Sequence, residues 1–263
     1  MSDARHGIYG VGPHLLAIPA EQVLEMFVLP EVRRPPGVPA WQRGVTLLRG
    51  SALPAIDLRV CLGLESSEHE LEVFLEEMRA REEDHRAWLA ELEASTREER
   101  PFKLATDPRQ CKFGRWYYSF KTDDAVVRGA LGAFEAPHAA IHALAGKVTA
   151  LRTEGRQADA LELLEASRTG LLAELIGIFA QTIRVVRQQH REVGAVVRLG
   201  RREVVLIVDR ADAVAELEAI EAGDDPLRDG SLRVELVSRL ARWRGSPQPV
   251  LVLDLERLAN LAA

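Results

Sequence analysis

The sequence has little or none of several features that mark whole classes of protein. It contains only two cysteines, Cys61 and Cys111, and two thiols cannot make the disulfide framework of a small secreted domain. The first ten residues, MSDARHGIYG, lack the charged and apolar regions of a secretory signal. No apolar run approaches the roughly 18 residues that cross a bilayer. These absences predict a cytoplasmic protein with reduced thiols.

The charge balance argues against another class of partner. The net charge is −6, and the 34 basic and 40 acidic side chains are interspersed. Proteins that bind nucleic acid gather basic residues in a patch, so we expect no nucleic-acid partner. The remaining composition, 47% hydrophobic and 28% charged, is typical of a globular protein. The length allows one large domain or two ordinary ones.

Residues 1–64 read as short strands separated by turns. Apolar runs of strand length occupy residues 15–19, 23–29, 44–50 and 53–58, with a proline-rich loop before the third run. Several short strands at close spacing favour a small barrel or sandwich. The early GIYGVG is no dinucleotide site, because no βαβ unit surrounds it. Cys61 lies between Val60 and Leu62, which predicts a buried apolar thiol.

Residues 65–191 change to a charged helical pattern. One helical face collects apolar residues at spacings of three, four and seven: Leu71, Leu75, Met78, His85, Leu89 and Leu92. Further helices are predicted for a fragment at residues 123–134, for a helix opened by Pro137, and for residues 158–190. Four helical stretches with apolar stripes predict an antiparallel four-helix bundle, a fold that commonly holds a metal in its core.

Four side chains of this block could hold such a metal. His85 points inward, and His138 and His142 stand one helical turn apart on one face. Together with Cys111 they make the three imidazoles and one thiolate that a zinc ion takes tetrahedrally. Taken alone, His85 is more simply a core histidine bonded to a carbonyl. The aromatic residues after Cys111 are, by themselves, more simply core. The other histidines (His6, His14, His69 and His190) are expected at the surface or in linkers.

Strand signals return in residues 192–263. Runs at residues 195–199 and 204–208 predict a hairpin. A turn is expected at residues 223–226, a weaker strand at 232–237, another strand at 249–254 and a short helix at 255–261. The sequence thus predicts an α+β protein of several domains, in which a β-rich fold stops at residue 64 and resumes near residue 194.

The β-rich segments resemble the CheW-like domain of bacterial chemotaxis adaptors. The letters GVTLLRGSALPAIDLR fit the G-V-x-x-L-R-G-x-x-x-P-x-I-D-L-R pattern of its first half. Residues 192–263 resemble the second half, except that an arginine-rich SRLARWRGSPQ replaces the usual turn. The resemblance implies two small five-stranded β-barrels that bind a histidine kinase and chemoreceptor tips. It also implies partner contacts at Val23, Glu25 and Arg49. On residue type alone these would be core, a solvated charge and a structural ion pair.

The helical block resembles the chemoreceptor zinc-binding domain. The motifs H-x-x-W, C-x-F-G-x-W and P-H-x-x-x-H occur in order, with Trp88, Gly114 and Trp116 also matching. The resemblance implies one zinc ion held by His85, Cys111, His138 and His142. The expected domains are residues 1–64 and 192–263 for the CheW-like host, with the helical block, residues 65–191, as an insertion.

Three functions compete on this basis. The first is a non-enzymatic adaptor of a chemosensory array with a zinc module that senses zinc or oxidant. The second keeps the adaptor and makes the zinc purely structural. The third is a zinc hydrolase. It is the weakest, because four protein ligands close the metal shell and no H-E-x-x-H helix occurs. The one nearby carboxylate, Glu135, precedes Pro137, and the sequence does not place it beside the ligands. No direct insertion into the membrane is expected.

Overall fold

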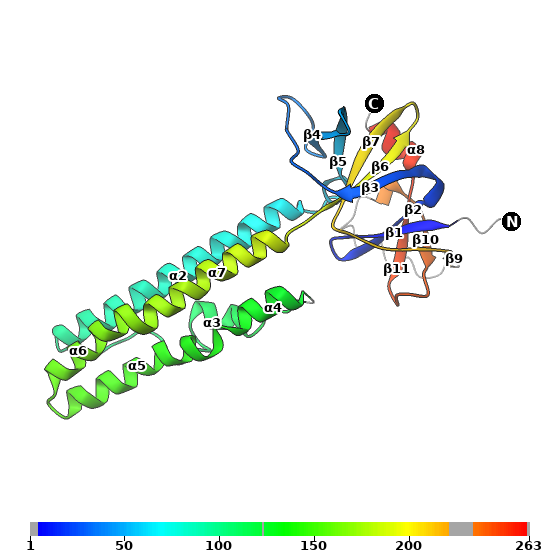
Figure 1. The fold of residues 1–263 in the computed structure, drawn as a ribbon. Helices are drawn as coiled ribbons and strands as arrows, with labels where there is room; N and C mark the ends of the chain where they lie inside the picture. Colours follow the sequence, from blue (N-terminus) through cyan, green and yellow to red (C-terminus); the bar gives the residue numbers. More distant parts are fainter. Residues whose placement is uncertain (1–4, 123, 221–233, 262–263) are drawn as a thin grey trace. The chain divides into compact units, whose positions relative to one another are not determined.

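The computed structural model of the chain describes residues 5–122, 124–220 and 234–261 (Figure 1). Their contacts separate two compact units. Both ends of the chain, up to Glu70 and from Arg191 onward, form the first unit, and Leu71–His190 form the second. The first is built on two β-sheets and the second is helical, which agrees with the predicted α+β class.

The first unit contains a six-stranded and a five-stranded sheet. The six-stranded sheet has the order β8 (Arg210–Ala215), β1 (His6–Val11), β2 (His14–Pro19), β11 (Pro249–Leu253), β10 (Val237–Arg242) and β9 (Glu218–Ala219). The five-stranded sheet has the order β3 (Val23–Val28), β6 (Val193–Leu199), β7 (Arg202–Val208), β5 (Ser51–Asp57) and β4 (Gln42–Leu48). One sheet therefore has a strand more than the five expected. Short helical elements complete the unit: η1 (Ala20–Gln22), α1 (Leu58–Cys61), η3 (Val234–Leu236) and α8 (Leu255–Leu261).

Each sheet takes strands from both ends of the chain. In one sheet β3 pairs with β6 and β5 runs parallel to β7. In the other, β1 pairs with β8 and β2 runs parallel to β11. The main core of the unit is likewise shared, with Leu16 and Ile56 packed in one cluster with Leu206 and Leu251. Cys61 belongs to this cluster and is 1% exposed, as predicted.

Two expectations for the first unit need correction, and one strand was missed. Strand β1 was not predicted, because its glycines conceal the apolar residues, and it makes His6 a buried residue with 6% exposure. The strand expected at residues 232–237 begins only at Val237, after the 3-10 helix η3. Residues 232 and 233, and the turn expected at residues 223–226, lie outside the described residues.

The second unit contains three long helical stretches and two short helices. The long ones are α2 (Ser67–Arg97, whose first residues belong to the first unit), α5 (Glu135–Thr153), and α6 (Gln157–Ser167), which continues through a π-turn, η2 (Arg168–Leu172), into α7 (Ala173–Gln189). The short ones are α3 (Lys112–Tyr117) and α4 (Ala125–Gly132). Asp123, where the fragment before α5 was expected to begin, lies outside the described residues. Sixteen buried side chains form one core across these helices.

The long stretch Gln157–Gln189 is apolar enough, by length and composition, to cross a membrane. Its best 18-residue window has a mean hydropathy of 1.4, so the expectation that no run approaches this criterion was wrong. A core helix meets the same criterion. Here Leu175 and Phe179 are fully buried in the core of the second unit, although only 22% of the window is buried.

Candidate metal centre

The structure brings the four predicted ligand residues together inside the second unit. His85 lies on α2, Cys111 precedes α3, and His138 and His142 lie on α5. One ligand atom from each residue falls within 4.8 Å of all the others. The three histidines are at most 4% exposed and Cys111 is half-buried. The cluster is therefore nearly closed to solvent, and it joins segments far apart in the sequence.

Aromatic side chains surround the imidazoles and keep water from them. The ring of His138 lies 4.9 Å from that of His142 and 5.1 Å from that of His85. Phe113 packs edge-on against His138 at 4.9 Å, and Phe179 of α7 lies 5.8 Å from His85. A buried apolar wall of this kind lowers the local dielectric and strengthens each polar interaction inside it.

Cys111 is positioned by the start of a helix. It is the N-cap of α3, and its Sγ accepts a hydrogen bond from the Gly114 amide at 3.1 Å. A β-carbon on Gly114 would lie 1.8 Å from the carbonyl oxygen of Pro108, so only glycine fits. The loop thereby holds Sγ at 3.3 Å from Nε2 of His138.

Main-chain carbonyls orient two of the imidazoles. Nδ1 of His85 donates to the carbonyl of Arg81 at 2.7 Å, and Nδ1 of His142 donates to that of Ala105 at 3.2 Å. The same Ala105 oxygen accepts from Nε1 of Trp88 at 2.8 Å. With the proton on Nδ1, each of these two histidines turns its lone pair on Nε2 into the cluster, as metal-binding histidines do. Motif reasoning missed both carbonyls, because any residue supplies one.

Three buried ring nitrogens have no hydrogen-bond partner among the described residues: Nε2 of His85, Nε2 of His142 and Nδ1 of His138. A buried polar atom left unpaired costs about 1–3 kcal/mol. Native proteins rarely keep such atoms without a reason. The two Nε2 atoms carry the lone pairs that a metal ion would bind.

Burial sets the protonation of the cluster. It lowers the pKa of His138 to about 3, with the charges of His85 and His142 acting in the same direction. It also lowers the pKa of His142 to about 4, and lowers that of His85. Burial raises the pKa of the Cys111 thiol. Near neutral pH the cluster therefore holds three neutral imidazoles and a protonated thiol, and only the thiol needs to lose a proton to become a ligand.

This donor set fits zinc. Zinc takes nitrogen and sulfur ligands and is four-coordinate in closed sites. Imidazole with thiolate is a common combination for it, whereas magnesium and calcium prefer oxygen. Glu135 does not belong to the cluster: it is exposed and accepts a hydrogen bond from Tyr118 at 3.1 Å.

A cavity of about 310 Å³ opens beside the cluster. Cys111, His85 and His142 line it together with Trp88 and Leu104. A small molecule from solvent can therefore approach the sulfur of Cys111, while His138 does not line this cavity.

The three predicted partner-binding residues lie elsewhere, in the five-stranded sheet. Val23 begins β3 and packs, half-buried, against the core of the first unit. Arg49 occupies the turn between β4 and β5 with a φ of 49°, and its Nη2 donates to Oε1 of Glu25 at 2.6 Å. The Arg49 side chain is 78% exposed. Packing and an ion pair thus account for all three residues locally, and partner contact remains a prediction.

Comparisons with known protein families find two domains in the chain, with a boundary inside α2. The family model described as the CheW-like domain matches residues 7–84, and that described as the chemoreceptor zinc-binding domain matches residues 85–149. A similar solved structure is the scaffolding protein TtCheW from Thermoanaerobacter tengcongensis. It is 10% identical, with a TM-score of 0.41 over 95% of this chain and 88% of that one. No curated protein matches the chain.

Residues 150–263 lie outside both matched ranges. The last strands are linked to the matched CheW-like segment by their pairing with its strands. CheW-like scaffolding proteins are adaptors without enzymatic activity, and the chemoreceptor zinc-binding domain is a sensor domain. The chain therefore carries a CheW-like domain followed by a chemoreceptor zinc-binding domain.

Proposed function

We propose that this protein is a chemosensory adaptor whose array function responds to a zinc site in its helical unit. The CheW-like unit, with residues 192–263 as its second half, would bind chemoreceptor tips and the regulatory domain of a histidine kinase. His85, Cys111, His138 and His142 would hold one zinc ion. Support for the two-part host comes from the strand pairs that join β3 to β6 and β5 to β7.

One observation carries the zinc assignment. Two neutral, buried imidazoles direct unpaired Nε2 atoms toward a thiol and a third imidazole. Hydrogen bonds from the described residues do not satisfy these atoms, whereas a cation would. A bound zinc ion would supply the positive charge that holds Cys111 as a thiolate. The chain's part is to present neutral histidines, orient two of them through carbonyls and exclude water with Phe113 and Phe179.

The size of the core favours a sensor over a purely structural site. Small zinc domains unfold without metal because they have almost no other core. Here the cluster sits among sixteen buried apolar side chains. Such a unit is expected to stay folded when the metal leaves, so that metal loss changes its conformation without destroying it.

Two inputs suit this site. Zinc availability would set its occupancy directly. Oxidation of Cys111 would remove a ligand, because a zinc-bound thiolate is the oxidisable form of cysteine. The cavity beside Cys111 gives an oxidant access to the sulfur, and this supports the second input.

A buried ion-pair network offers a route for the output. In the first unit, Arg43 bonds both Asp57, at 2.5 Å, and Glu192, and Glu192 in turn accepts from Ser67. Ser67 is the first residue of α2, and Glu192 follows α7 by three residues. The two chain segments that lead into and out of the inserted helices are therefore joined by the Ser67–Glu192 hydrogen bond, and Arg43 ties Glu192 to the CheW-like sheet.

The test combines metal analysis with kinase output. The purified chain should contain one zinc, and a mild oxidant should release it. Cys111→Ala and His142→Ala should lose the metal, keep their helical circular dichroism and change kinase output in a reconstituted array. Unfolding of both variants would favour a structural zinc. A chain without metal, and without affinity for zinc below micromolar, would refute the zinc site.

A further inference from the structure

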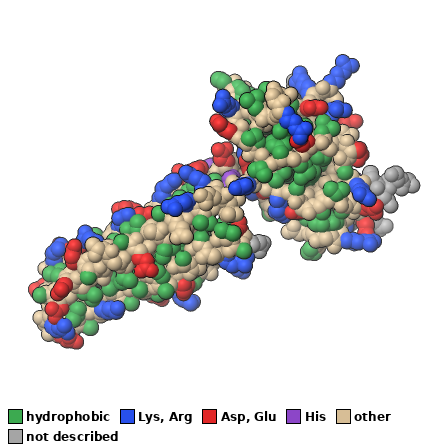
Figure 2. All heavy atoms as spheres, viewed as in Figure 1, with side chains coloured by type: hydrophobic (Ala, Val, Ile, Leu, Met, Phe, Trp, Pro, Cys, Tyr) green, Lys and Arg blue, Asp and Glu red, His purple; other side chains and the backbone are tan. Residues whose placement is uncertain are grey.

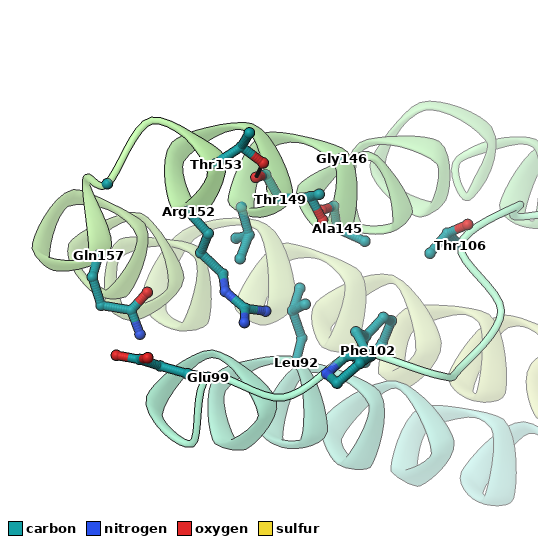
Figure 3. A pocket seen from close by; sticks show the side chains of 13 residues that line it. Leu92, Glu99, Phe102, Thr106, Ala145, Gly146, Thr149, Arg152, Thr153 and Gln157 are labelled. Atoms are coloured by element: carbon teal, nitrogen blue, oxygen red, sulfur yellow. Dashed lines mark hydrogen bonds between the residues drawn. The ribbon is translucent and has the colours of Figure 1, made fainter.

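We propose that a second cavity of the helical unit binds a small monocarboxylate with an apolar body, and that this ligand acts on His142. The cavity has a volume of about 940 Å³ and lies between α5 and the segment that follows α2 (Figure 3). Ligand sites in proteins typically measure about 300–1,000 Å³. Nothing in the zinc assignment uses this space.

The floor of the cavity is apolar. Leu92, Ala145 and Val148 line it and are buried, each at most 4% exposed. Phe102, half-buried, adds an aromatic face from the segment after α2. A ligand with a hydrocarbon or aromatic body would therefore cover apolar surface here, which is the main source of affinity in small-molecule sites.

The guanidinium group of Arg152 is the part of the cavity that would bind the ligand's carboxylate. Figure 3 shows its side chain reaching from α5 into the space beside Leu92 and Phe102. One nitrogen, Nη1, donates to the carbonyl of Arg100 at 3.1 Å, and Arg152 forms no ion pair within the described part of the chain. A guanidinium has five N–H donors in a fork that matches a carboxylate. Most of these donors remain for a ligand.

Three further polar residues of the cavity, Thr149, Thr153 and Glu99, argue against a larger anion. The hydroxyls of Thr149 and Thr153 donate to carbonyls of their own helix, at 2.7 and 2.9 Å, so they offer no proton to an anion. Glu99 is exposed at the rim, and its charge would repel a second negative group. A single carboxylate on Arg152 is the chemistry that these residues fit.

The cavity and the candidate metal centre share a wall. Phe102 packs edge-on against Trp88, with ring centroids 5.1 Å apart, and Trp88 lies 4.9 Å from the ring of His142. The segment that carries Phe102 also carries Ala105, whose carbonyl holds both His142 and Trp88. A ligand that moves Phe102 would therefore disturb the groups that orient His142. This coupling rests on the zinc site proposed above, whereas the binding of the carboxylate does not.

Binding is tested by calorimetric titration of the full chain, metal-free and zinc-loaded, with phenylacetate, butyrate and inorganic phosphate. Phenylacetate should bind with one site per chain, more tightly than butyrate, and phosphate should bind least. Arg152→Gln should weaken phenylacetate at least about tenfold, the loss expected when a charged hydrogen bond is removed. The control Arg184→Gln, on exposed α7 surface, should leave binding unchanged.

A second pair of variants guards against effects on folding. Gly146 lines the cavity, and a β-carbon there would meet nothing within 4 Å. Gly146→Leu should therefore fill the cavity and abolish binding without removing any contact. Gly177→Leu, equally free of neighbours on α7, should not affect binding. The site is refuted if none of the three probes saturates the wild-type chain, or if binding survives both Arg152→Gln and Gly146→Leu.

Coupling is read from zinc affinity in competition with a chelator. Saturating phenylacetate should shift the zinc dissociation constant about fivefold or more, the lower range for linked sites. An unchanged constant would overturn the coupling. If the chain binds no zinc at all, the proposed function fails, yet phenylacetate binding to the metal-free chain and its loss in Arg152→Gln still decide the cavity.

Discussion

The sulfur of Cys111 lies 3.3 Å from Nε2 of His138, although the two residues are 27 positions apart. The pair joins the capped start of α3 to the middle of α5. In the metal-free chain a protonated thiol can donate to this neutral imidazole. Any metal that takes both atoms must displace that proton, so metal binding and the protonation of Cys111 are linked.

Zinc binding at pH 7 should release about one proton. The three histidines are already neutral, since burial depresses the pKa values of His138 and His142 to about 3 and 4. The thiol, whose pKa burial raises, is the only group that must deprotonate. Calorimetry in buffers of different ionisation enthalpy measures the number of protons released per zinc ion bound. Cys111→Ala should release none, and two or more protons from the wild type would contradict the neutral histidines.

The metal-free chain should lose stability as the solution is acidified. Unfolded, these histidines take a proton near their ordinary pKa of 6.5; folded, His142 does so only near 4 and His138 only near 3. The unfolded state therefore binds more protons below pH 6.5, and the free energy of unfolding falls as pH drops toward 4. The slope is about 1.4 kcal/mol per pH unit for each histidine.

Chemical denaturation of the metal-free chain at several pH values checks this slope. His138→Gln should reduce the slope of the unfolding free energy against pH by the contribution of one histidine. His69→Gln, a change at an exposed histidine, should leave the slope unchanged. At the alkaline end the sign reverses. The raised pKa of Cys111 means that the unfolded thiol ionises first, so stability should fall as pH rises above the thiol's ordinary value of 9.0. A flat profile from pH 7 to 5 would contradict the burial of neutral histidines.

Gly114→Ala should damage the metal centre more than the helix. The new β-carbon would lie 1.8 Å from the Pro108 carbonyl, which forces the Cys111 loop away from its capping position. We expect weaker zinc binding in a competition assay and a loss of stability of about 1–3 kcal/mol, as for other overpacked sites. Gly129→Ala, in α4 with nothing within 4 Å, is the control. It should stabilise by roughly 0.5–1 kcal/mol, and equal effects of the two changes would count against the packing argument.

Arg43→Met should destabilise the first unit while zinc still binds. The change leaves the carboxylates of Asp57 and Glu192 buried without their cation; their side chains are only 3% and 11% exposed. Breaking a buried ion pair typically costs about 3–5 kcal/mol. Burial alone would lower the pKa of Arg43, but its bonds to Glu192 and Asp57 raise it above the ordinary value, so the arginine stays charged. Arg198→Met, in the exposed pair with Glu203, should cost less than about 1 kcal/mol.

Substitutions of Arg49 separate its structural from its proposed functional role. Its left-handed φ of 49° costs an L-residue about 1–2 kcal/mol relative to glycine, while the exposed pair with Glu25 contributes at most about 1 kcal/mol. Arg49→Gly should therefore keep or raise stability, and Arg49→Ala should lower it slightly. If Arg49 contacts a partner, both should reduce binding to the kinase or receptor in a pull-down. Normal binding by both would limit Arg49 to its ion pair.

The four candidate ligands could be predicted from the sequence, whereas the contacts that orient them could not. The inward position of His85 and the one-turn spacing of His138 and His142 follow from helical periodicity, and the structure brings both to Cys111. The carbonyls of Arg81 and Ala105 carry no sequence signal, because backbone oxygens are the same at every residue. Strand β1 was missed for a related reason: Gly7 and Gly10 interrupt the apolar alternation, and the space that they leave is taken by the side chains of Tyr9 and Arg210.

The sharing of strands between the two ends of the chain also sets an order of folding. Strand β5 is complete at Asp57, but its parallel partner β7 begins only at Arg202. During synthesis the first strands must therefore wait, with their edges unpaired, until about 145 further residues have been made. Every residue of the helical unit, Leu71–His190, emerges within that interval. Helical bundles generally fold faster than sheets that pair distant strands. The helical unit can therefore be folded, with its metal bound, before β7 completes the five-stranded sheet.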